Sequence, residues 1–306
     1  MDIDLNGYEY PFSVQRFHFR SQQQDLEMAY MHERSPRPNG QTVVLLHGKN
    51  FNGAYWGQTM RALLEAGYEV VVPDQIGFGK STKPAHYQYT FQQLAHNTAA
   101  LLDQTQVKQC IVLGHSMGGM VATRFSLMYP ERVRQLVLVD PIGLEDWKLK
   151  VPYTTIDEWY AQELAKTPEK IKAYQQKSYY GGEWKPAYDR WVYPLAAPLN
   201  SPEYPRLAWN NALTYDMIFT QPVCYEFSQL EVPTLLMVGT EDRTALGKDK
   251  VASAVAETMG DYPRLARATV AQIPDARLVL FEGLGHLPHI EDFPRFWGEL
   301  SKGLRN

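Results

Sequence analysis

The sequence predicts an α/β fold, in which helices cover both faces of an open parallel β-sheet. Six short runs of continuous apolar residues, rich in β-branched side chains, are typical of strands buried on both faces. Helical patterns alternate with several of these runs, which indicates parallel strands joined by right-handed crossovers. The alternation stops between Val139 and Leu235, where no convincing core strand occurs.

Two alternating segments come first along the chain. Residues Val14–Phe19 and Leu26–Tyr30 alternate between polar and apolar side chains, which predicts strands with one face exposed. We expect them to form a hairpin whose turn lies within Ser21–Asp25.

The strands that follow differ in being apolar throughout, and helix signals lie between them. Thr90 with Gln93 matches a capping box that would open a helix ending near Thr105. A second helix is expected directly after Ser116, ending at Tyr129-Pro130. The six predicted core strands are Val43–Leu46, Val70–Val72, Ile111–Leu113, Leu136–Val139, Leu235–Val238 and Leu278–Phe281.

The strand-free segment carries helix starts and many rings. From Trp147 to Phe219, 15 of 73 residues are aromatic, including five of the seven tryptophans. We interpret this as an inserted helical cap over residues 144–228, between core parts 1–143 and 229–306. Its rings either fill a small core or roof a ligand cavity. The helix starts are Thr155 with Glu158, Thr167-Pro168 and Ser201-Pro202.

Composition excludes several classes of protein. The 306 residues carry a net charge of −4, which gives no reason to expect nucleic acid or an anionic membrane as partner. No run of 18 apolar residues and no signal-peptide pattern occurs. We therefore expect a soluble cytoplasmic monomer or homodimer acting on a small molecule, or a periplasmic or secreted protein if a signal has been removed.

The most specific motif is Gly114-His115-Ser116-Met117-Gly118, which lies between a predicted strand and a predicted helix. An abrupt strand-to-helix turn strains the central residue and exposes its side chain at the carboxyl edge of the sheet. Small residues two positions away on either side permit such a turn. The motif therefore predicts Ser116 as a nucleophile.

A serine nucleophile needs a base, and the base needs a carboxylate. His286 follows the last predicted strand on a glycine-flanked loop, and His289 is the rival. Asp242 follows the strand before it, and Asp140 is the alternative acid. The order serine, aspartate, histidine is the one expected on this architecture. Three other residues at strand ends are expected to hold loops or turns: His47, Asp74 and His115.

An oxyanion hole requires two preorganised donors. We expect one from the N–H of Met117 and the other from the N–H of Lys49, with Asn50 as second choice. Substrate contacts are also predicted for four side chains: Asn50, Trp147, Trp159 and Trp184. No phosphate-binding loop, dinucleotide fingerprint or metal-ligand cluster is recognisable, so we expect no cofactor and no metal.

Taken together, these segments resemble the α/β-hydrolase superfamily over almost the whole chain. The resemblance implies a mostly parallel eight-stranded sheet with the N-terminal hairpin as its first two strands and a cap entering near Asp140. It also implies that Ser116, Asp242 and His286 form a catalytic triad. It is carried, in family order, by His47-Gly48, Asp74–Ser81, Gly114–Gly119, Asp242 and Gly285-His286.

The resemblance implies a serine hydrolase that forms an acyl-enzyme from a small ester with an apolar or aromatic part. A serine nucleophile argues against dehalogenases and epoxide hydrolases. Carbon–carbon bond hydrolysis, lactone opening and aminopeptidase activity remain alternatives, and so does a non-catalytic binding protein. An aminopeptidase would need cap carboxylates for the substrate ammonium, and the candidates are Glu158, Glu163, Glu169, Glu183 and Asp189.

Overall fold

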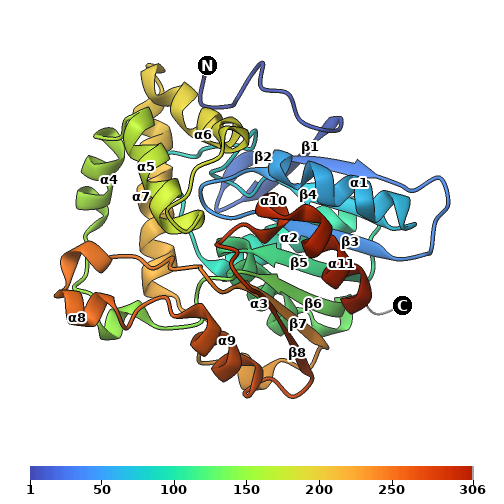
Figure 1. Cartoon of the computed structure of the whole chain (residues 1–306). Coiled ribbons are helices and arrows are strands. Elements are labelled where there is room, and N and C mark those ends of the chain that lie inside the picture. The colour runs from blue at the N-terminus through green and yellow to red at the C-terminus, as the bar shows by residue number, and fades with distance from the viewer. Residues whose placement is uncertain (305–306) are drawn as a thin grey trace.

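The computed structural model describes residues 1–304, and its centre is one eight-stranded sheet. The strand order is β1-β2-β4-β3-β5-β6-β7-β8 (Figure 1). The pairs β1–β2 and β2–β4 are antiparallel and all others are parallel, which confirms the predicted fold class. The strands are β1 Val14–Ser21, β2 Gln24–Glu33, β3 Thr42–Leu46, β4 Glu69–Pro73, β5 Cys110–His115, β6 Val133–Val139, β7 Thr234–Gly239 and β8 Ala276–Phe281.

The N-terminal hairpin is tighter than the sequence suggested. Ser21 pairs with Gln24, so only Gln22 and Gln23 form the turn. Both have positive φ, 48° and 63°. Two consecutive residues with positive φ match the right-handed twist of the flanking strands. Neither is glycine or asparagine, which is why the sequence did not reveal the two-residue turn.

Helices cover both faces of the sheet (Figure 1). One apolar cluster joins one face to α2, α3 and α9, and a second joins the other face to α1 and α11. Within β3, Val44 and Leu46 belong to the first cluster while Val43 and Leu45 belong to the second. This two-sided burial explains the continuous apolar strands. The helices are α1 Gly57–Glu65, α2 Phe91–Gln104, α3 Met117–Met128, α9 Tyr262–Val270 and α11 Phe293–Gly303.

Helices fill the segment between β6 and β7, as the aromatic insertion predicted. They gather at one side of the sheet (Figure 1), where α4 packs against α7 and α5 against α6. None of the described helices is both long and apolar enough to cross a membrane. The four helices are α4 Ile156–Leu164, α5 Pro168–Tyr179, α6 Asp189–Ala196 and α7 Tyr204–Thr220; short helices α8 Ser253–Ala256 and α10 Pro288–Glu291 lie farther along the chain.

Most of the predicted helix starts are confirmed. Thr155 and Glu158 form a reciprocal capping box at α4, and Thr167 caps α5 with proline at its first position. Thr90 caps α2, but the Gln93 side chain donates a hydrogen bond to Asn97 and not to the cap residue, so the second bond of the capping box is absent.

The start predicted at Ser201-Pro202 is wrong. The Ser201 hydroxyl accepts a hydrogen bond from the N–H of Glu203 within a turn, and α7 begins at Tyr204, with Pro205 inside its first turn. Serine followed by proline is as typical of a turn as of a helix start.

Candidate active site

Ser116 lies on the strained connection between β5 and α3, with φ 56° and ψ −121°. This conformation is uncommon for a residue with a side chain. A Cβ on Gly114 would overlap the carbonyl of Gly118, and a Cβ on Gly118 would overlap the carbonyl of Leu46. The two flanking glycines are therefore required by close backbone approach, as the motif predicted.

His286 and Asp242 form a buried pair on the loops that follow β8 and β7. Nδ1 of His286 lies 2.7 Å from Oδ2 of Asp242, and both side chains are fully buried. The other oxygen, Oδ1, accepts the N–H of Thr244 at 2.8 Å. An ionised carboxylate only accepts hydrogen bonds, so the imidazole proton lies on Nδ1 and the lone pair on Nε2.

Within the described residues no hydrogen bond joins the Ser116 hydroxyl to the imidazole of His286, although the two loops are in contact. The ring of His115, next to Ser116 in the chain, lies 4.7 Å from the ring of His286 between centroids. Within residues 1–304, Nε2 of His286 has no hydrogen-bond partner. Catalytic hydrogen bonds are often long without substrate and tighten when it binds, so this geometry is compatible with a base that acts on Ser116.

Asp140, the alternative acid, has a different environment. Its Oδ1 accepts the N–H of Gly239 at 2.8 Å. Burial and the neighbouring charge of Asp242 raise the pKa of Asp140 well above its usual range. A carboxyl group held neutral in this way is poorly suited to stabilise an imidazolium. Asp140, Asp242 and His286 each offer one atom that could bind a metal ion, and these three atoms lie within 4.8 Å of one another. Nδ1 of His286, however, is already hydrogen-bonded to Asp242.

His289, the alternative base, is fully buried on α10 and stacks on Trp56 with ring centroids 4.6 Å apart. Burial and the nearby His286 lower the pKa of His289 to about 3. Neither of its ring nitrogens has a partner among the described residues. It has no carboxylate that could stabilise a positive charge.

The loop-holding roles predicted for His47 and His115 are confirmed. Nε2 of His47 accepts the N–H of Gln75 at 3.0 Å. Nε2 of His115 lies 2.8 Å from the carbonyl of His286, and its Nδ1 lies 3.0 Å from the Tyr55 hydroxyl.

Asp74 anchors a turn, as predicted. Its oxygens accept the N–H groups of Gly53 and Lys80 and the hydroxyl of Tyr10, at 2.6 to 2.7 Å. These bonds join the loop after β3 to the turn after β4 and so fix the segment that follows Lys49.

The proposed oxyanion donors are backbone groups beside the serine. Ser116 Cβ lies 3.1 Å from the position that a Cβ would occupy on Gly48, so the loop after β3 passes directly over the elbow. Neither the N–H of Lys49 nor that of Met117 has a hydrogen-bond partner in the described part of the chain. Unpaired N–H groups at a helix start favour a developing negative charge.

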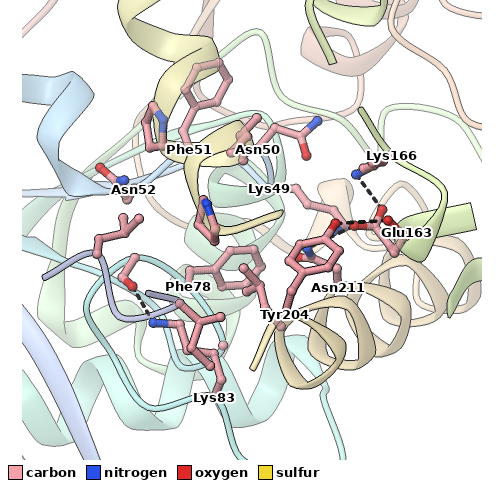
Figure 2. A pocket seen from close by; sticks show the side chains of 18 of the residues that line it. Lys49, Asn50, Phe51, Asn52, Phe78, Lys83, Glu163, Lys166, Tyr204 and Asn211 are labelled. Atoms are coloured by element: carbon pink, nitrogen blue, oxygen red, sulfur yellow. Dashed lines mark hydrogen bonds and ion pairs between the residues drawn. The ribbon is translucent and has the colours of Figure 1, made fainter. Parts of the chain in front are cut away.

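A cavity of about 60 Å³ adjoins this loop, and Lys49 and Asn50 line it (Figure 2). Lys49 is buried, as are Glu163 and Lys83, which also line it. Asn50 donates to the hydroxyl of Tyr179 at 2.8 Å.

The three tryptophans predicted to contact substrate lie outside this lining. Trp147 belongs to the main apolar core, Trp159 stacks on Tyr215, and Trp184 packs edge-on against Tyr180. One ring packs in the main core and two pack within the cap, so substrate contact by them stays a prediction of the sequence alone.

Sequence reasoning missed several residues around the imidazole. The ring of Tyr179 stacks on His286 with centroids 4.8 Å apart, and the Tyr179 carbonyl accepts the N–H of His286. Glu291 accepts the N–H groups of Gly285 and Leu287 at 3.1 Å, which braces the loop on both sides of the base. Only the aromatic richness of the cap gave any signal for Tyr179.

Comparison with known proteins agrees with this architecture. A model of the alpha/beta hydrolase family matches residues 43–297. The crystal structure of a probable hydrolytic enzyme from Pseudomonas aeruginosa PAO1 superposes with a TM-score of 0.98 at 49% identity, covering 100% of this chain and 98% of that one.

Curated relatives have hydrolase names. Lipase 1 of Psychrobacter immobilis is 26% identical over 82% of this chain and 73% of its own length. The pimeloyl-[acyl-carrier protein] methyl ester esterase of Aeromonas hydrophila is 40% identical over 33% of this chain. Five relatives, this esterase among them, are matched over only 32% to 41% of their own length.

Proposed function

Because this chain belongs to the alpha/beta hydrolase family, we propose that it is a serine hydrolase that cleaves a small carboxylic ester through an acyl-enzyme. One observation carries the proposal: Asp242 engages Nδ1 of the buried His286 and leaves its Nε2 without a partner among the described residues, while the carbonyl of His286 lies 2.8 Å from Nε2 of His115, the residue before the strained Ser116. Esterase and lipase names among the relatives support ester substrates.

In this mechanism Ser116 attacks the acyl carbonyl while Nε2 of His286 takes the hydroxyl proton. Asp242 holds the Nδ1 tautomer and stabilises the imidazolium. The developing oxyanion accepts hydrogen bonds from the N–H groups of Lys49 and Met117. His286 then returns the proton to the leaving alcohol, and water, activated by the same imidazole, releases the acid from Ser116.

The direct test is hydrolysis of p-nitrophenyl butyrate by the wild type, Ser116→Ala and the exposed control Ser301→Ala. We expect a loss of at least about 10³-fold in kcat for Ser116→Ala, since the nucleophile and base act as one unit. Ser301→Ala should match the wild type. Equal turnover by Ser116→Ala and wild type would overturn the proposal.

The alternative reactions use the same residues and are separated by substrate. A panel of esters, lactones, vinylogous diketones and aminoacyl amides assigns the bond that is cleaved. The structure lends the aminopeptidase alternative little support, because Glu163, the buried one of the five candidate carboxylates, is already paired with Lys166.

A further inference from the structure

The cavity beside the loop that follows β3 lies between the core and the cap. Its core side is formed by residues 49–52 and 77–79, and its cap side includes Glu163, Lys166 and Asn211 (Figure 2). Its volume of about 60 Å³ is several times what one water molecule needs. Lys49 supplies one of the proposed oxyanion N–H groups and also lines the cavity, so an ester held at that N–H would have this space beside it.

Glu163 is buried at the end of α4, and both of its oxygens are occupied. Oε1 pairs with Nζ of Lys166 at 2.5 Å, and Oε2 accepts from Nδ2 of Asn211 at 3.0 Å (Figure 2). One positive and one negative charge therefore compensate each other on the cap side.

Lys49 forms no ion pair of this kind among the described residues. Its Nζ lies over the ring of Tyr215, 3.8 Å from the centroid, and 3.4 Å from Oδ1 of Asn211. No carboxylate lies within ion-pair distance of it among residues 1–304. The remaining lysine of the cavity, Lys83, is paired with Asp4 and the carbonyl of Gly79.

We propose that this cavity binds an ionised carboxylate of the substrate between Lys49 and Lys166, so that the preferred esters carry a second, anionic group. This inference rests on the proposed hydrolase function. Protonated Lys49 is the one lysine of the described cavity lining that forms no ion pair, and an unpaired buried charge is costly. An incoming carboxylate supplies the missing partner.

The opposite polarity fits the cavity less well. A substrate ammonium would need Glu163, whose oxygens already accept from Lys166 and Asn211. It would also approach the ammonium of Lys49. The cavity walls include the apolar side chains of Phe78 and Ile171, so the charge of the ligand is expected at the end of a short apolar chain.

Electrostatics around Lys49 agree with a site for an anion. Burial lowers the pKa of Lys49 to about 7, opposed by Glu163 and reinforced by Lys166. The facing hydroxyl of Tyr215 stays neutral, because burial raises its pKa well above the usual range. Above pH 7 the free enzyme loses the charge on Lys49, so KM for an anionic ester should rise relative to KM for a neutral one.

The test compares esters of equal length and different charge. In the first set the acyl part varies: monomethyl adipate is anionic, methyl hexanoate is neutral and methyl 6-aminohexanoate is cationic. In the second set the alcohol part varies: 4-acetoxybutanoate is anionic and pentyl acetate is neutral. We expect kcat/KM to be at least tenfold higher for one anionic ester than for its neutral partner. Preference for the neutral or the cationic ester would overturn the inference.

Variants then assign the preference to the cavity. Lys166→Met should lower the ratio of anionic to neutral kcat/KM about tenfold, and Lys49→Met should do the same. Lys177→Met, which removes an exposed lysine of α5, should leave the ratio unchanged. Because Lys166→Met strands Glu163, the double variant Lys166→Met/Glu163→Gln checks that lost folding is not the cause. An anion preference that survives in both Lys166→Met and Lys49→Met would contradict the site.

A binding experiment separates this inference from the proposed function. Calorimetric titration of adipate into Ser116→Ala needs no turnover. Binding that Lys166→Met weakens tenfold supports the anion site even if no ester is hydrolysed. Ester hydrolysis by the wild type with no adipate binding and no anion preference would retain the hydrolase and reject the site.

Discussion

Two buried carboxyl groups lie beside the imidazole of His286, and their environments give them different roles. The carboxylate of Asp242 accepts hydrogen bonds from Nδ1 of His286 and from a backbone N–H, and such bonds favour the charged form of a carboxyl group. Asp140 is held neutral because burial and Asp242 raise its pKa well above the usual range. The acid chosen from strand order is therefore also the one whose environment suits the task.

This difference predicts unequal effects of two similar substitutions. Asp140→Asn keeps an oxygen for the N–H of Gly239, so kcat should fall less than about threefold. Asp242→Asn removes the ion that orients His286, and kcat should fall by about 10³-fold or more. Steady-state kinetics on one ester measures both. A loss in Asp140→Asn as large as that in Asp242→Asn would show that the acid has been misassigned.

Glu291 makes stability depend on pH in a predictable direction. Its burial raises its pKa from 4.5 to about 7. Between these values the folded state binds more protons at this site than the unfolded chain, so this contribution to the free energy of unfolding falls as pH rises.

Glu291→Gln mimics the protonated carboxyl and retains an acceptor for Gly285 and Leu287. Urea denaturation should therefore find the variant more stable than the wild type at pH 8, by up to about 3 kcal/mol. The difference should vanish at pH 4.5. A difference independent of pH would mean that the side chain does not titrate in this range.

At the scale of elements, the turn from β5 into α3 depends on close backbone approach. Gly118→Ala would place a methyl group against the carbonyl of Leu46. Because a backbone atom cannot swing aside, we expect a loss of about 2 kcal/mol or more in the free energy of unfolding.

The matched control for Gly118→Ala is Gly298→Ala in α11, where a Cβ would meet nothing within 4 Å. Alanine is the better helix former, so this control should gain up to about 1 kcal/mol. The denaturant midpoints of the two variants measure these changes in stability. Equal changes in the two variants would contradict the close packing of the elbow.

The elements were predictable where the signal was local. The elbow at Ser116 follows from glycines that backbone contact requires, and the caps at Thr155 and Thr167 follow from hydrogen bonds within one turn. Ser201 failed because the same residue type also closes turns. A local pattern specifies a local structure but does not always distinguish a turn from a helix start.

At the scale of the whole molecule, the site is assembled from segments far apart in sequence. Tyr179 of the cap stacks on His286, and Lys49 of the core reaches Asn211 of the cap. Such contacts depend on how the cap sits on the sheet, and no sequence pattern encodes them. The order of the motifs predicted which strand ends would meet, but not which side chains of the cap would surround them.

A series of hydrogen bonds also links the loop after β3 to the loop that carries His286. The N–H of Gly48 donates to the Tyr55 hydroxyl, which lies beside Nδ1 of His115, and Nε2 of His115 contacts the carbonyl of His286. Tyr55→Phe would strand buried groups at both ends of the hydroxyl, so we expect a loss of about 1–3 kcal/mol in the free energy of unfolding. Tyr193→Phe, at an exposed tyrosine, should change it by less than 0.5 kcal/mol. Thermal denaturation measures both changes. A Tyr55→Phe variant as stable as the wild type would contradict the importance of these hydrogen bonds.

The central claim is that Ser116 is activated by the His286–Asp242 pair. Mass-spectrometric identification of the residue modified by a fluorophosphonate probe tests it most directly, with Ser116→Ala, His286→Ala and Ser301→Ala beside the wild type. We predict modification of Ser116 in the wild type and in Ser301→Ala, none in Ser116→Ala, and a rate at least about 100-fold lower in His286→Ala. Modification at another residue, or an undiminished rate without the imidazole, would contradict the account.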